Sequence, residues 1–110
     1  MNMHEIELAA MRASNHFFDR DTKRFFRSRI LPTTYEGPGG IYFVTSEQFH
    51  SPTTGYTAQR GYTVRKFEQG ERVRESDGRT VSTVKIDTVG DFNVMTRAQA
   101  VRMARKLAEG

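Results

Sequence analysis

The sequence predicts an α+β fold, in which helices pack mainly on one face of an antiparallel sheet of three or four strands. Three observations predict it. A helix-forming stretch opens the chain, β-branched and aromatic runs separated by turn residues fill its middle, and an amphipathic stretch with a capping signal closes it. The length of 110 residues fits one domain over 1–110.

The N-terminal part of the chain predicts two helices. An acidic start followed by alanines leads us to expect that residues 1–14 form a short helix or are flexible. The segment Asp19-Arg20-Asp21 offers N-cap choices for a second helix over residues 22–30. Because proline cannot continue a helix, we expect Pro32 to end it.

Segments rich in β-branched and aromatic residues predict strands at 41–45, 61–67 and 80–89, and two turn signals bracket a further short strand at 71–75. Turn residues such as Gly, Asp and Ser separate them. The segment 71–75 is charged, which suits the edge of a sheet. The polar loop 50–60 has little to bury, so we expect it to be mobile.

The C-terminal segment predicts a helix over residues 96–109. Thr96 and Gln99 match a capping box, in which the two side chains bind free backbone N–H groups at the start of the helix. Val101, Leu107 and several alanines form one face, and the charged residues form the other. We expect the apolar face to cover the sheet.

Several classes of chemistry are absent from the residue pattern. The chain has no cysteine, which excludes disulfides and thiolate metal sites. His4, His16 and His50 are far apart and form no metal-binding pair. No nucleophile or phosphate-loop motif is present either. We therefore expect no catalytic residues, no metal, no cofactor and no enzymatic activity.

The distribution of apolar residues argues against a membrane protein. No run approaches the roughly 20 apolar residues of a membrane-spanning helix. Glu5 and Glu7 stand where a secretory signal peptide would be basic. We expect the protein to be soluble and cytoplasmic, in the host cell if it is encoded by a phage.

Positive charge is the main feature of the composition. The net charge is +4, and 13 of the 17 basic residues are arginines. It is concentrated in segments 12–29, 60–79 and 97–110, which carry +4, +2 and +3. Arginine suits bidentate contacts with phosphate or carboxylate groups. A partner rich in either group is expected, although charged outer helix faces also occur without a ligand.

One helix face and one strand supply the candidate binding residues. Four cations in the second predicted helix recur at i, i+3, i+4 and i+7, which places them on one side. Two further cations follow each other on the strand 61–67, where we expect them to be exposed. Those on the last helix are expected to serve solubility. The candidates are Arg20, Lys23, Arg24, Arg27, Arg65 and Lys66.

Aromatic residues alternate along two of the predicted strands. They are Tyr42 and Phe43 on the first, and Tyr62 and Phe67 on the second. Exposed rings beside arginine would stack on unpaired bases. The same rings could instead close a small core. The sequence leaves both interpretations open.

Several motifs resemble a family of small uncharacterised proteins that occur in bacteriophages, prophages and actinobacterial genomes. They are the segments His16–Arg29 (HFFDRDTKRFFRSR), Gly40–Glu47 (GIYFVTSE), Tyr62–Arg65 (YTVR) and Thr88–Phe92 (TVGDF), with the alanine-rich end of the chain. The resemblance carries no activity. It implies a phage or mobile-element setting, in which small proteins regulate genes or disarm host machinery.

The order of elements also resembles two binding folds at the level of topology. One is the double-stranded-RNA-binding domain, with a helix, three strands and a helix. The other is the arm-type DNA-binding domain of tyrosine recombinases, to which Phe92 followed by Thr96–Ala100 is similar. Both resemblances imply contact with nucleic acid.

Two functions follow as hypotheses. The first is a non-enzymatic binding module whose basic surface contacts nucleic acid. The alternative is an inhibitor of a host protein, such as an anti-CRISPR or another anti-defence factor, which binds an acidic protein surface. Salt-dependent binding to nucleic acid favours the first, and a protein partner that survives nuclease treatment favours the second.

Overall fold

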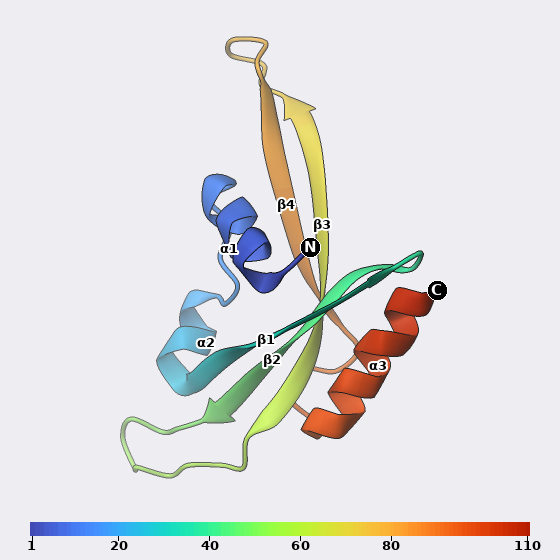
Figure 1. Ribbon diagram of the computed structural model, residues 1–110. Helices are drawn as coiled ribbons and strands as arrows, with labels where there is room; N and C mark the ends of the chain where they lie inside the picture. Colours follow the sequence, from blue (N-terminus) through green and yellow to red (C-terminus); the bar gives the residue numbers. More distant parts are fainter.

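The computed structural model describes residues 1–110 as one four-stranded antiparallel sheet with three helices (Figure 1). The strands lie in chain order, β1-β2-β3-β4. The predicted α+β class and the antiparallel sheet are confirmed. The elements are α1 (Met3–Arg12), α2 (Arg20–Phe25), β1 (Phe26–Gly37), β2 (Gly40–Phe49), β3 (Gly61–Val73), β4 (Thr80–Val89) and α3 (Arg97–Glu109).

The helices are divided between the two faces of the sheet. On one face, α3 packs through Ala100 and Ala104 against a cluster that contains Tyr42 and Val44. On the other, α1 packs against a cluster that contains Phe43. This differs from the expected packing mainly on one face. The physical reason lies in β2, because a strand covered on both faces is a nearly continuous apolar run rather than an alternating one.

The second predicted helix is wrong beyond Phe25. The chain forms only the six residues of α2, capped by the Asp19 side chain, and then continues as strand β1. From Phe26 to Ile30 the exposed arginines Arg27 and Arg29 alternate with half-buried residues, which is the period of two of a strand, and the segment pairs with β2. Pro32 lies within β1, where the register shifts between Ile30 and Thr34. An irregular edge strand tolerates the missing N–H of proline.

The two predicted strands 61–67 and 71–75 are one long strand, β3. Its first half pairs with β2, and its second half pairs only with β4. The β3–β4 hairpin therefore projects from the body of the molecule (Figure 1), which measures 51 × 35 × 21 Å. We call residues 68–85 the arm.

The helices at the two ends of the chain agree with the sequence. Thr96 and Gln99 form the predicted capping box at the start of α3. Asn2 and Glu5 form a second capping box that opens α1. The loop 50–60 links β2 to β3 and contains one β-bridge, between His50 and Thr57. None of the three helices has the length and apolar character needed to cross a membrane.

Candidate functional site

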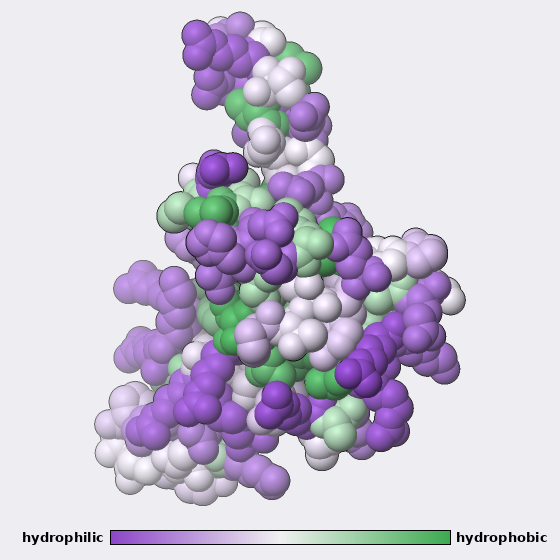
Figure 2. Space-filling model, viewed as in Figure 1, coloured by the Kyte–Doolittle hydropathy of each residue, from purple (hydrophilic) through white to green (hydrophobic).

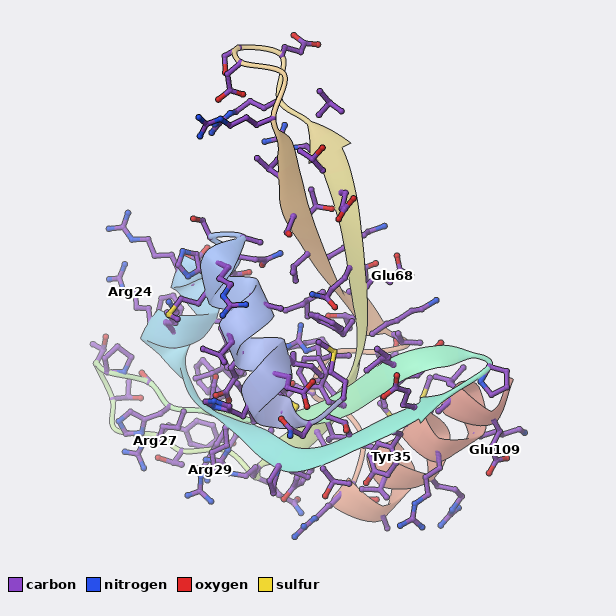
Figure 3. All side chains as sticks on the ribbon, turned by 45° about the horizontal axis from the view of Figure 1, so that its top comes forward. Arg24, Arg27, Arg29, Tyr35, Glu68 and Glu109 are labelled. Atoms are coloured by element: carbon purple, nitrogen blue, oxygen red, sulfur yellow. The ribbon has the colours of Figure 1, made fainter.

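The predicted cationic stripe is not a single surface. Arg20, Lys23 and Arg24 lie exposed on α2, whereas Arg27 lies on β1. Figure 3 shows Arg24 standing apart from Arg27 and Arg29, which extend from the same end of β1. The helical spacing that predicted one face ends where the helix becomes a strand.

Two of the α2 cations lie beside a carboxylate. Arg20 and Lys23 line a hollow of about 640 Å³ that Asp19 also lines. The backbone N–H of Thr22 donates to the Asp19 carboxylate at 2.7 Å, and this bond lowers the pKa of Asp19. Asp19 therefore carries its negative charge at neutral pH and offsets part of the positive charge of α2.

Arg65 is buried, contrary to the expectation of an exposed strand cation. Only 8% of the residue is accessible. Its Nη2 donates to Glu47 Oε1 at 3.0 Å, and its Nε and Nη1 donate to the hydroxyls of Thr45 and Thr88. The rings of Phe18 and Phe92 lie within 6 Å of the guanidinium carbon. The guanidinium of Arg65 is therefore occupied by the ion pair with Glu47 and by the two hydroxyls, and it is not available to bind a phosphate.

Glu47, the partner of Arg65, is completely buried. Thr45 Oγ1 donates to its Oε1 at 2.6 Å and Thr63 Oγ1 to its Oε2 at 3.0 Å. Each carboxylate oxygen thus has a hydrogen bond, which a buried charge requires. This network joins β2 to β3 and forms the polar part of the core.

Lys66 is also paired with an acidic residue. Its Nζ lies 3.1 Å from Glu68 Oε1 and 5.8 Å from the centre of the Tyr42 ring. The hydrogen bond to Glu68 raises the pKa of Lys66. Both strand cations that were predicted as binding residues, Arg65 and Lys66, therefore form ion pairs within the protein.

Three other arginines converge on a pocket between β1 and the start of α3. The pocket has a volume of about 200 Å³ and is lined by Arg29, Arg60 and Arg97, together with Ser46, Tyr62 and apolar residues of β1. No carboxylate lines it, and none of the three arginines forms an ion pair. We call this the arginine pocket.

Each arginine reaches the pocket from a different element. Arg29 pairs with Ser46 in the register of β1 and β2, so its side chain lies on the α3 face of the sheet. Arg60 Nη1 donates to Ser46 O at 3.2 Å and to Arg27 O at 3.0 Å, which fixes it across the ends of both strands. Arg97 is the first residue of α3.

A second hollow of about 300 Å³ adjoins the arginine pocket. Arg60, Tyr62 and Arg97 line both hollows, and Gln59 and Val94 line only the second. The loop after β4 forms its far wall. This loop is held to β3 because Tyr62 N donates to Met95 O at 3.0 Å. We call this the side hollow.

The charged side chains that line the arginine pocket are all cationic. Guanidinium groups bind the oxygens of phosphate or carboxylate through parallel N–H bonds. Ser46 also lines the pocket, and its hydroxyl oxygen accepts a hydrogen bond from Arg60 Nη1 at 3.2 Å. No group of three or more His, Asp or Glu side chains is gathered anywhere in the chain in a way that could hold a metal ion. The arrangement is suited to binding an anion.

The sequence missed Arg29, Arg60 and Arg97 as site residues. They lie 31 and 37 positions apart in the chain, and no spacing rule connects them. One local signal was present, because Arg27 and Arg29 alternate with apolar or small residues in the manner of a strand. The meeting of the three arginines depends on how α3 lies against β1.

A family model matches residues 2–106, nearly the whole chain. The chain belongs to this family of unknown function, DUF7447. No curated protein and no solved structure matches it. Because the function of this family is unknown, membership of DUF7447 indicates neither a ligand nor an activity.

Proposed function

We propose that this DUF7447 protein is a non-enzymatic nucleic-acid-binding module whose arginine pocket holds a backbone phosphate. The observation that carries the proposal is the convergence of Arg29, Arg60 and Arg97 on a pocket that no carboxylate lines. Unpaired arginines at close range repel one another and favour an anionic ligand between them. A phosphate supplies the charge and the oxygen acceptors that this geometry requires.

Further cations extend the surface around the pocket. Arg27 precedes Arg29 by two residues on β1, so both side chains lie on the α3 face. Arg105, two turns after Arg97 on α3, lies over the ring of Tyr35 at 5.7 Å. A row of cations therefore runs along β1 and α3. Such a row fits the regularly spaced phosphates of a nucleic-acid strand better than it fits one small anion.

We also propose that the α2 cations Arg20, Lys23 and Arg24 add a second, weaker contact at the edge of this surface, because Asp19 offsets part of their charge. The resemblance to phage and prophage proteins supports a mobile-element setting and action in the cytoplasm of the host cell. An acidic host protein, as an inhibitor would bind, is the alternative occupant of the same arginines.

The proposal is tested by measuring affinity for labelled oligonucleotides as a function of salt. We expect the logarithm of the binding constant to fall linearly with the logarithm of salt concentration, with a slope of roughly −3 to −6 for four to six phosphate contacts. The double variant R29Q/R97Q should bind about tenfold or more weakly and make the slope shallower by about 1, because it loses the one phosphate contact of the pocket and the counterion release that goes with it.

The control is the double variant R102Q/K106Q. Both of its residues are exposed and face outward on α3, and the charge removed is the same. Its affinity should stay close to that of the unchanged protein. Equal losses in the two variants, or no binding to DNA or RNA at about 50 mM salt, would overturn the proposal. A stoichiometric protein partner captured from nuclease-treated host lysate would then favour the inhibitor.

A further inference from the structure

We infer that the binding site takes an unpaired nucleotide, with its phosphate in the arginine pocket and its base in the side hollow. The protein would then prefer a single strand to a duplex. This inference rests on the proposed function and adds to it which form of nucleic acid is bound. The observation behind it is that the two hollows share Arg60, Tyr62 and Arg97 as a common wall.

The arginine pocket is charged and part of the side hollow is apolar, just as the phosphate of a nucleotide is charged and the faces of its base are apolar. Three arginines line the first, which suits the charged phosphate. The second is walled by the apolar side chain of Val94, by Met95 and by the half-buried Tyr62. Apolar and aromatic side chains are the groups on which proteins place unstacked bases.

Val94 does not pack into either hydrophobic cluster of the core. Its side chain is 68% exposed although it is apolar, and it lies on a short loop between β4 and α3. An exposed valine by itself is common on protein surfaces. Here it lines a hollow that Tyr62 also lines, so a planar ligand in the hollow could contact both side chains.

Gln59 can bind the edge of a base. Its amide offers both donors and an acceptor, and the residue is exposed at the rim of the side hollow. The neighbouring amide of Asn93 is used differently. With its nitrogen toward the sheet, it donates to the carbonyl oxygens of Glu47 and Gly61 at 2.7 and 3.2 Å. Asn93 therefore holds the loop in place, and Gln59 remains for the ligand.

A base in a duplex cannot occupy the side hollow. It is stacked on both sides and its edge is paired, so it would have to leave the helix first, and unstacking costs free energy. A base in a single strand has no such requirement. The hollow around Arg65 is a less suitable place for the nucleotide, because Asp19 and Asp91 line it and would repel the phosphate.

The test compares oligonucleotides that share the phosphates but differ in the bases. A 12-nucleotide DNA strand, an abasic strand of the same length and the matching duplex are titrated at one salt concentration. We expect the DNA strand to bind about tenfold more tightly than either of the others. An RNA strand compared with its own duplex repeats the test with the other sugar, and a single-strand preference with either sugar supports the inference.

Matched variants locate the base. The double variant Q59A/V94A should lose the preference for the normal over the abasic strand and keep the salt dependence of the unchanged protein. The control Q69A/V73A removes the same two side-chain types from exposed positions on the arm, where Val73 is 66% exposed. It should keep the preference, and circular dichroism shows that both variants are folded.

The outcomes separate the two proposals. If the abasic strand and the duplex bind as tightly as the single strand, or if Q59A/V94A keeps the preference, the inference is wrong and phosphate binding still stands. If no oligonucleotide binds, the proposed function and the inference fail together.

Discussion

Arg65 and Arg29 are the same residue type on one sheet, and the groups that face them give them different roles. Arg65 lies on the α1 face opposite the buried carboxylate of Glu47, so its charge is neutralised inside the protein. Arg29 lies on the α3 face, where the lining of its pocket holds two further arginines and no carboxylate. One is therefore part of the core, and the other is available to a ligand.

The buried ion pair makes a prediction for stability. Replacing Glu47 with alanine leaves the Arg65 charge buried without its partner, which destabilises proteins by about 3–5 kcal/mol. We expect the urea midpoint of E47A to fall steeply, or the variant not to fold at 37 °C. The control is E68A, which removes the exposed partner of Lys66 and should leave the midpoint almost unchanged. Equal midpoints for E47A and E68A would contradict the structural role of the pair.

For the candidate residues of α2 and the start of β1, the sequence correctly predicted exposure to solvent. Arg20, Lys23, Arg24 and Arg27 are exposed as expected. For Arg65 the expectation failed, because Glu47 lies 18 positions earlier in the chain and meets it only when β2 and β3 pair. Charge pairing of this kind depends on strand register, which a single sequence does not reveal.

At the scale of elements, small residues set how closely α3 approaches the sheet. Ala100, Ala104 and Ala108 form the buried side of the helix. Its last turn meets the β1–β2 hairpin, where Gly39 N donates to Ala108 O at 3.0 Å. A Cβ on Gly39 would lie 1.8 Å from Leu107 O, so only glycine permits this approach. The close contact also places Arg97, at the other end of α3, beside β1.

Enlarging the buried side of α3 should therefore destabilise the protein. We expect A104L to lower the free energy of unfolding by about 1–3 kcal/mol, because a leucine does not fit against β2 without moving the helix. The matched control is A98L, at an exposed position in the first turn of α3, which should change stability little. Urea unfolding measures both, and a more stable A104L would show that the helix is not closely packed.

The elements differ in how far the sequence could predict them. Helix α3 was predictable because its capping box and its apolar face are both local. Strand β1 was not predictable in this way. The cations on both sides of Phe26 recur at helical spacing, although the helix ends at Phe25 and a strand begins at Phe26. The alternation from Phe26 to Ile30 was the competing signal, and pairing with β2 decided the outcome.

At the scale of the whole molecule, charge is divided between the body and the arm. The arm carries acidic residues beside its cations, and Asp77 at its tip pairs with Arg74 and Arg79. The hydrogen bond from Arg74 lowers the pKa of Asp77, which keeps this carboxylate charged. Hydrophilic side chains dominate the face shown in Figure 2, including much of the arm. The part of the basic stretch 60–79 that lies on the arm thus contributes no net positive charge, whereas Arg60, which lies before the arm, lines the arginine pocket without an ion-pair partner.

The arm should accordingly be dispensable for folding and for nucleic-acid binding. Every residue from Glu68 to Thr80 is exposed, so replacing residues 72–81 with an Asn-Gly turn between Glu71 and Ser82 removes almost no buried surface. We expect the free energy of unfolding to change by no more than about 0.5 kcal/mol. The affinity for a single-stranded oligonucleotide should stay within about twofold, because none of the arginines around the pocket lies on the arm. A large loss of affinity in a shortened protein that is still folded would place part of the binding surface on the arm. Loss of the cooperative unfolding transition would show that the hairpin is needed for the sheet to form.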